Sequence, residues 1–98
     1  MKINAADPLD LEIAASSFAA LGSEQRLTVL RVLVRAGPAG LNIGAWGTRS
    51  GVTGSTLTHH MKILSSAGLV SQTRQGRSII CAAVAYDQLH NLADFLVN

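Results

Sequence analysis

The chain has 98 residues, of which 48% are hydrophobic, so its composition predicts one small globular domain over residues 1–98 and excludes a disordered chain. It has one cysteine, no apolar run approaching the roughly 18 residues of a membrane span and no signal-peptide pattern, which predicts a cytoplasmic protein with neither an internal disulfide nor a membrane partner. The net charge is only +2, but residues 36–85 contain four cations and no Asp or Glu, which indicates a surface facing a polyanion unless it arises by chance.

Two amphipathic helices are predicted in the first part of the chain. Asp7 and Pro8 are typical of a helix N-cap and first helical position, and apolar residues at helical spacing follow until Gly22. Ser23 is the N-cap of a second helix, which the glycines and proline of residues 36–40 end. The predicted apolar stripe of this second helix consists of Leu27, Leu30, Leu33 and Val34.

A short helix and a longer one follow. Residues 42–50 contain Trp46, a candidate core anchor, between two glycines that weaken a helix by about 1 kcal/mol each. Residues 51–54 form a tight connection, and residues 54–67 form a clear helix that Gly68 ends. A short helix, a turn and a second helix make a helix-turn-helix arrangement.

The period then changes to that of β-strands. Within residues 69–84, two stretches rich in β-branched residues flank Gln75-Gly76, a pair typical of a two-residue hairpin turn. Residues 86–97 return to helical spacing. The predicted fold class is therefore mainly α with a small β-hairpin, in the order α-α-α-α-β-β-α.

Two adjacent histidines point to different faces of the helix over residues 54–67. At about 100° per residue, His59 shares one arc with Ser55, Thr58, Lys62 and Ser66, whereas His60 borders the stripe formed by Leu57, Met61 and Leu64. Helical metal ligands need a spacing of three or four, so this pair is not expected to bind a metal. We expect His60 to be a packed histidine with a hydrogen-bond partner.

The polar face has the composition of a helix that enters the major groove of DNA. Short side chains let the backbone approach the bases, and hydroxyl and imidazole groups can hydrogen-bond to base edges. A cation at Lys62 suits a phosphate, and two cations at the hairpin tip can reach sugar-phosphate. The alternative for the polar face is an ordinary solvated helix surface, and the alternative for the two hairpin cations is a charged turn that keeps the protein soluble. The predicted DNA-binding residues are Ser55, Thr56, Thr58, His59, Lys62, Arg74 and Arg77.

Three segments together resemble the arsenical-resistance repressor (ArsR) family of winged helix-turn-helix proteins. They are FAALGSEQRLTVLRVL, GSTLTHHMKILSSAGLV and RQGRSIICAAV, which match in order and spacing over roughly residues 10–97. The resemblance implies a homodimeric regulator that binds double-stranded operator DNA, typically a repressor released by a metal, metalloid or redox signal. It also implies a recognition helix near residues 54–67, a wing near 69–84 and dimerisation through the first and last helices. Candidate interface residues there are Phe18, Leu21, Leu89, Leu92 and Leu96.

The chain departs from this family in its candidate sensor residues. Many members hold a Cys-x-Cys pair before the recognition helix, but residues 41–52 contain no cysteine. Asp87, His90 and Asp94 share a face of the last helix, as in other members, but no second histidine follows, and we predict solvated surface without a metal or other cofactor. One branch senses arsenite through a cysteine pair beyond this helix. Because arsenite prefers several thiolates, we expect a metalloid effector to need residues beyond 98, not Cys81 alone.

The sequence is also compatible with two functions other than DNA binding. A winged-helix module can serve protein–protein interaction without binding specific DNA, because a fold alone does not determine function. A membrane-surface role is less well supported, since the amphipathic ends of the chain lack a strongly basic face. No nucleophile–base constellation, carboxylate pair or phosphate-binding loop is present, so an enzyme is not expected.

Overall fold

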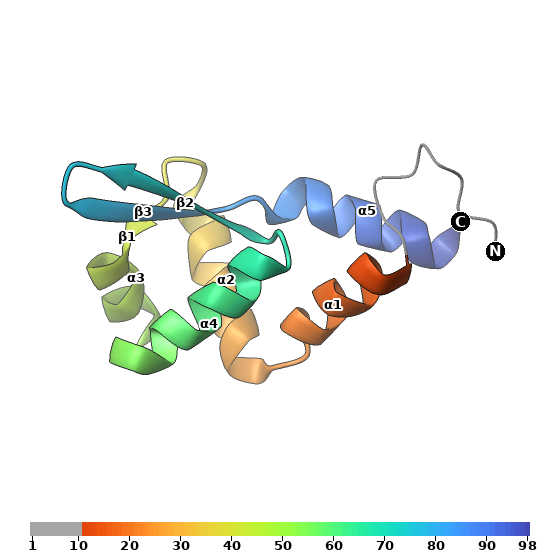
Figure 1. Cartoon of the computed structure of the whole chain (residues 1–98), viewed down its shortest axis with the longest axis horizontal. Helices are drawn as coiled ribbons and strands as arrows, with labels where there is room; N and C mark the ends of the chain where they lie inside the picture. The colour runs from red at the N-terminus through yellow and green to blue at the C-terminus, as the bar shows by residue number, and fades with distance from the viewer. Residues whose placement is uncertain (1–10) are drawn as a thin grey trace.

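The computed structural model describes residues 11–98, which form five helices and a three-stranded sheet (Figure 1). The helices are α1 (Leu11–Leu21), α2 (Glu24–Ala36), α3 (Ile43–Ser50), α4 (Gly54–Ser66) and α5 (Ala85–Val97). The strands are β1 (Leu41–Asn42), β2 (Val70–Gln75) and β3 (Ser78–Ala83). The predicted order of helices and hairpin is confirmed, whereas the predicted N-cap at Asp7 and Pro8 lies outside the described residues. None of the described helices is long and apolar enough to cross a membrane.

Short-range hydrogen bonds begin and end the helices where the sequence predicts. The Ser23 hydroxyl accepts a bond from the Arg26 amide at 3.2 Å and caps α2. At the end of α4, the Gly68 amide donates to the Ser65 carbonyl at 3.0 Å, and the Leu69 amide donates to the Leu64 carbonyl at 2.9 Å. This pair of bonds is a Schellman motif, and the φ of +76° at Gly68 explains why glycine ends the helix.

The main core lies between α2, α3, α4 and the sheet, with Trp46 at its centre. The Trp46 side chain is fully buried, and its Nε1–H donates to the Val29 carbonyl of α2 at 2.9 Å. This confirms Trp46 as a core anchor. A second, smaller core joins Ala14 of α1 to Leu92 of α5.

The predicted apolar stripe of α2 is partly wrong. Leu30 and Leu33 are buried as expected, but Leu27 is 43% exposed and Val34 is 51% exposed. Val29 takes their place in the core. The helix is apolar on two overlapping stripes, and the stripe that contains Val29, Leu30 and Leu33 is the one that packs in the core.

The sheet differs from the prediction in two ways. It contains one strand, β1, that the sequence did not indicate, and its hairpin turn lies one residue later in the chain than predicted. β1 pairs antiparallel with β3, so that Leu41 lies opposite Cys81, and β3 lies between β1 and β2. Gln75 pairs with Ser78, so the turn residues are Gly76-Arg77 rather than Gln75-Gly76. Gly76 has a φ of +61° and Arg77 does not have a positive φ, which suits a type II′ turn with glycine first.

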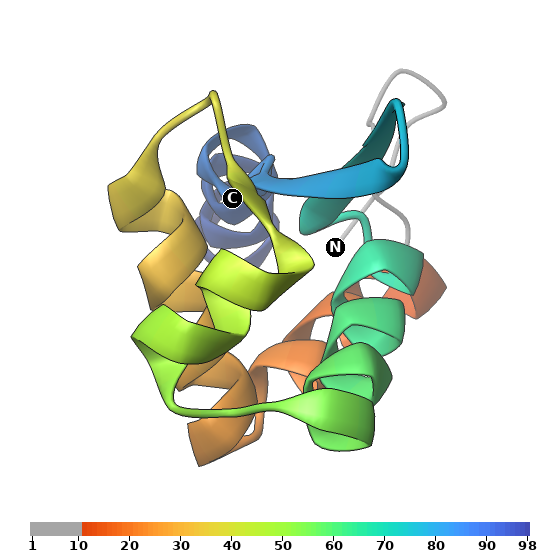
Figure 2. The ribbon, with the colours of Figure 1, turned by 90° about the vertical axis from the view of Figure 1, so that its left-hand side faces the viewer.

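The elements divide between two ends of an elongated molecule. In Figure 1, α3 and the tip of the β2–β3 hairpin lie at one end, and the start of α1 and the end of α5 lie at the other. Figure 2 looks onto the first end and shows α3 joined to α4 by a short turn, with the hairpin above them. The helix-turn-helix and the hairpin therefore share one end of the chain, away from the terminal helices.

Gly40 provides a test of how the sheet is held. A side chain at Gly40 (φ +72°) would overlap the Cys81 carbonyl of β3, whereas one at Gly51 (φ +73°) would meet open space. Both Gly40→Ala and Gly51→Ala incur the left-handed backbone cost of about 1–2 kcal/mol. We expect Gly40→Ala to lose about 1–3 kcal/mol more because of this overlap. Urea unfolding of the two variants measures the difference, and equal losses would contradict the close approach of residue 40 to β3.

Candidate nucleic-acid interface

The structure places the predicted recognition residues on the outer face of α4. Ser55, Thr56, His59 and Lys62 are exposed, and Thr58 is half-buried. The Thr58 hydroxyl donates to the Gly54 carbonyl at 3.3 Å, so its lone pairs remain to accept a hydrogen bond from a ligand. The inner face of α4 buries Leu57, Met61 and Leu64 in the core. The period of the helix therefore separates its polar and apolar faces as the sequence predicts.

His60 is a packed histidine, as expected. Its ring is 6% exposed, and Nε2 lies 2.7 Å from Oε1 of Gln25 in the first turn of α2. Because an amide oxygen accepts, Nε2 carries the proton, and Nδ1 is left buried without a hydrogen-bond partner. Burial, then the charge of Arg26 and then His59, lower the pKa of His60 below its ordinary value. His60 is therefore a neutral link between α2 and α4 rather than a surface cation.

Side chains from two other elements hold the last turn of α4. Gln72 of β2 donates through Nε2 to the Ser65 hydroxyl at 2.8 Å. The fully buried Ser17 of α1 donates to the Ala67 carbonyl at 3.4 Å and accepts from Nε2 of Gln88 in α5 at 3.1 Å. Sequence reasoning missed these residues, because a polar pair between distant segments leaves no periodic pattern. They join the hairpin and both terminal helices to the recognition helix.

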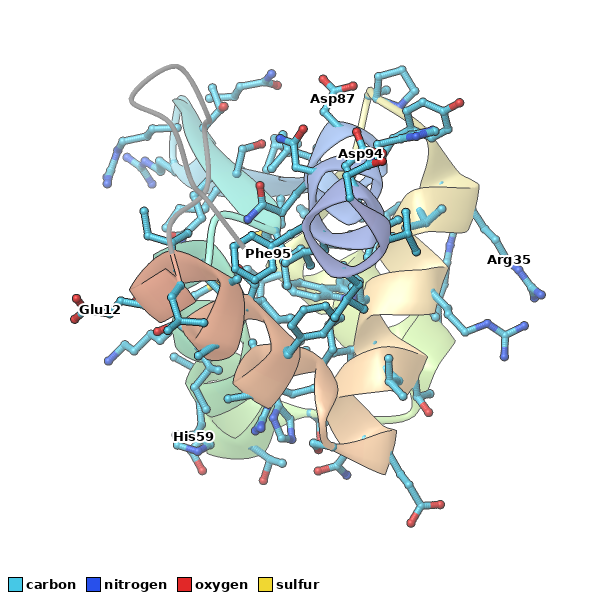
Figure 3. All side chains as sticks on the ribbon, turned by 90° about the vertical axis from the view of Figure 1, so that its right-hand side faces the viewer. Glu12, Arg35, His59, Asp87, Asp94 and Phe95 are labelled. Carbon is cyan, nitrogen blue, oxygen red and sulfur yellow. The ribbon has the colours of Figure 1, made fainter. Side chains whose placement is uncertain are left out.

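The hairpin carries its two cations at the surface. Arg74 lies in β2 opposite Ile79, and Arg77 lies in the turn itself. Both side chains are exposed. In Figure 3, the hairpin, His59 of α4 and Glu12 of α1 lie on the same side of the molecule, and Arg35 of α2 projects from the opposite side. The outer face of α4 at His59 and the hairpin therefore lie on the same side of the molecule (Figure 3).

The predicted dimerisation residues are not all on the surface. Phe18 is 37% exposed, Leu89 is 40% exposed and Leu96 is 68% exposed, whereas Leu21 is half-buried. Leu92 is 2% exposed because it packs on Ala14 of α1 within the same chain. Leu92 was predicted in the dimer interface, but the structure places it inside the single chain, so it does not share the exposed surface of the other candidates. Its role is to join α1 to α5.

Cys81 is buried in the core, whereas the candidate sensor residues of α5 are exposed. Cys81 is fully buried and its Sγ lies 3.7 Å from Sδ of Met61, and burial raises the pKa of its thiol. A buried protonated thiol is a poor metal ligand. Asp87, His90 and Asp94 are exposed on α5. Within residues 11–98, no group of three or more His, Cys, Asp or Glu side chains is placed to hold a metal ion.

Comparison with known proteins identifies the family. The chain is 33% identical over 69 residues to the uncharacterized HTH-type transcriptional regulator YceK of Bacillus subtilis. The matched region covers 70% of this chain and 68% of that protein. It is 32% identical to the structure of an ArsR-like transcriptional regulator from Rhodococcus, with a TM-score of 0.75 over 87% of this chain and 76% of that one.

A third comparison concerns a protein whose assembly is known. The homodimeric winged helix-turn-helix DNA-binding domain of a possible ArsR-family regulator from Mycobacterium bovis is 25% identical, with a TM-score of 0.72 over 89% of this chain and 78% of that one. No protein-family model matches the chain. These similar proteins are transcriptional regulators rather than enzymes. The chain belongs to the ArsR family of winged helix-turn-helix transcriptional regulators.

Proposed function

We propose that this protein is a homodimeric repressor that binds operator DNA with α4 in the major groove. The observation that carries the proposal is the outer face of α4, where short hydroxyl side chains, an imidazole and a lysine are exposed on a helix whose other face is buried. The surrounding residues 36–85 contain no acidic residue that would repel DNA. The related Mycobacterium bovis domain is described as a homodimeric DNA-binding domain, which supports the proposal.

Base reading is assigned to the first turns of α4. Ser55 and His59 are one turn apart and both exposed, so they can reach adjacent base edges while Thr58 accepts a hydrogen bond between them. Thr56 is exposed beside them. Gln25, Gln72 and Ser17 keep the helix in place through bonds that DNA does not need to supply.

Backbone contacts are assigned to the cations around the reading face. Lys62 lies one turn beyond Thr58 on α4, and Arg74 and Arg77 lie at the hairpin tip. Long cationic side chains at the margin of a groove-binding helix contact phosphates, which orient the protein without reading sequence. Each phosphate contact makes the affinity depend more steeply on salt.

Dimerisation is assigned to the end of the molecule formed by α1 and α5. Phe18, Leu89 and Leu96 expose apolar surface there, and Figure 1 shows this end opposite the helix-turn-helix. A two-fold axis at this end would place two copies of α4 on half-sites about one turn of DNA apart. A cytoplasmic location follows from this function.

Release by an effector is the remaining part of the proposal. A soft metalloid needs several thiolates, and the buried Cys81 thiol supplies one at most. We therefore expect that arsenite does not release residues 1–98 from DNA by binding to this chain alone.

Base reading can be separated from general affinity by two substitutions. Ser55→Ala and His59→Ala should each cost about 1–3 kcal/mol on an operator selected from a random library, and less on a random duplex, because only the operator offers matched base edges. Fluorescence anisotropy titrations against both DNAs measure this. Thr28→Ala, which removes an exposed hydroxyl from α2, is the matched control. Equal losses on the two DNAs would show that these residues only position the protein.

The oligomeric state tests the dimer. We expect the wild-type chain to sediment as a dimer at micromolar concentration and Leu96→Asp to shift it toward monomer, because the substitution places two carboxylates in an apolar interface. Ala39→Asp, in the exposed loop before β1, carries the same charge change and should remain a dimer. Leu92→Asp is unsuitable, since it disrupts the core of the single chain. A wild-type monomer, or equal behaviour of the two variants, would contradict this dimer.

The neutral state of His60 predicts a loss of stability in acid. Because burial lowers the pKa of His60, the unfolded chain takes up a proton at a higher pH than the folded chain. The free energy of unfolding should therefore decrease as the pH falls below about 6.5, the ordinary pKa of histidine. Urea titrations at neutral and acidic pH should show a smaller decrease for His60→Gln than for wild type. A decrease as large as that of wild type, or one matched by the exposed-site control His90→Gln, would contradict this role.

A further inference from the structure

A groove runs between α1, the start of α2 and the last turns of α4. Its volume is about 430 Å³, and its polar lining residues are Ser16, Arg26, Lys62 and Ser66. Alanines of α1 and Ile63 of α4 form the apolar part of the lining. Two of the described lining residues are cations and none is acidic, so the groove suits an anionic partner.

The positive charge at the start of α2 is held in place by α1. Nε of Arg26 donates to the Ala20 carbonyl at 2.7 Å, and one terminal nitrogen donates to the Ala19 carbonyl at 3.3 Å. These bonds fix the guanidinium at the wall of the groove instead of leaving it free to swing into solvent. Arg26 therefore supplies a stationary charge, while the exposed Lys62 and the hydroxyls of Ser16 and Ser66 can move to meet a ligand.

The groove continues the side of the molecule that carries the recognition residues. Lys62 and Ser66 belong both to the polar face of α4 and to the groove. Figure 3 shows Glu12 of α1 projecting to the same side as His59 of α4. A helix inserted in the major groove has a sugar-phosphate strand on each flank. With α4 in the major groove as proposed, one strand would face the hairpin and the other would pass the flank of α4 that borders α1.

We propose that the sugar-phosphate backbone of the bound duplex lies across this groove, so that DNA contact extends from α4 onto α1. The proposal rests on the DNA-binding function proposed above. Lys62 and the hydroxyls of Ser16 and Ser66 donate to phosphate oxygens, and Arg26 adds its fixed charge behind them.

Glu12 marks where this contact ends. A smaller adjoining pocket of about 190 Å³ shares Ser16, Ser66 and Ala67 with the groove and is also lined by Glu12. Its carboxylate is one helical turn before Ser16 and repels phosphate. The backbone therefore passes on the Ser16 side of Glu12, and α1 limits the duplex to this path.

The test places one new cation in the groove and one elsewhere. Ser16→Lys should steepen the slope of log affinity against log salt by about two per dimer, since each subunit gains a phosphate contact. Thr28→Lys adds the same charge to α2 on the face that carries Arg35, which Figure 3 shows on the opposite side, and should leave the slope unchanged. Glu12→Gln removes the carboxylate that repels phosphate and should tighten binding to random duplex several-fold. Anisotropy titrations over a range of salt concentrations measure all three variants.

The outcomes separate this proposal from the proposed function. Equal slopes for Ser16→Lys and Thr28→Lys, with normal operator binding by wild type, would overturn the groove contact and leave the DNA-binding function intact. If Ser16→Lys fails to fold, Glu12→Gln decides, and unchanged affinity would overturn the contact. A wild-type chain that binds no duplex at all would overturn both.

Discussion

Burial of one face of α4 is the constraint on which the rest of the structure depends. Leu57, Met61 and Leu64 enter the core with His60 beside them, so the opposite face of the helix points outward. That face carries the hydroxyls, the His59 imidazole and the lysine assigned to DNA. Apolar burial alone would allow the helix to slide or rotate, because it is not directional. The hydrogen bonds from Gln25, Gln72 and Ser17 remove that freedom by tying α4 to α2, β2 and α1. Apolar packing therefore determines which face of α4 points outward, and the hydrogen bonds determine where that face lies.

Some of these hydrogen bonds connect α4 to the terminal helices α1 and α5, which are proposed to form the dimer. Ser17 bonds both to Gln88 of α5 and to the carbonyl that follows α4, so the terminal helices and the recognition helix meet at one buried hydroxyl. Leu92 fills the space between α1 and α5 inside the chain, whereas Phe18, Leu89 and Leu96 of the same helices stay exposed and are the residues proposed for the dimer interface. A change in how α1 packs on α5 would alter the position of α4, because the Ser17 hydroxyl bonds to both α5 and the end of α4. Coupling of this kind needs two packing arrangements of similar energy, which small interfaces can provide.

Much of the fold and of the reading face can be predicted from sequence, because both depend on short-range periodicity. The period of α4 alone separates His59 from His60, and caps such as Ser23 and Gly68 place helix ends within a residue or two. Contacts between distant segments are what sequence reasoning misses. β1 has two residues and exists through its pairing with β3. Which apolar stripe of α2 is buried depends on core residues from distant elements. The sequence also leaves the turn position open by one residue, because Gln75-Gly76 and Gly76-Arg77 both contain the glycine and only the strand register distinguishes them.

The pairing of Leu41 with Cys81 also bears on the order in which the molecule folds. The helices and the β2–β3 hairpin form from contacts between near neighbours, whereas β1 can join the sheet only after a long loop closes, which costs chain entropy before any bond is gained. We expect α2, α3 and α4 to assemble early and β1 to join the sheet late. The Gln72–Ser65 bond, between residues seven positions apart, can hold the hairpin to the end of α4 early. The link from β3 back to the segment between α2 and α3 is then among the last features of the native state to form.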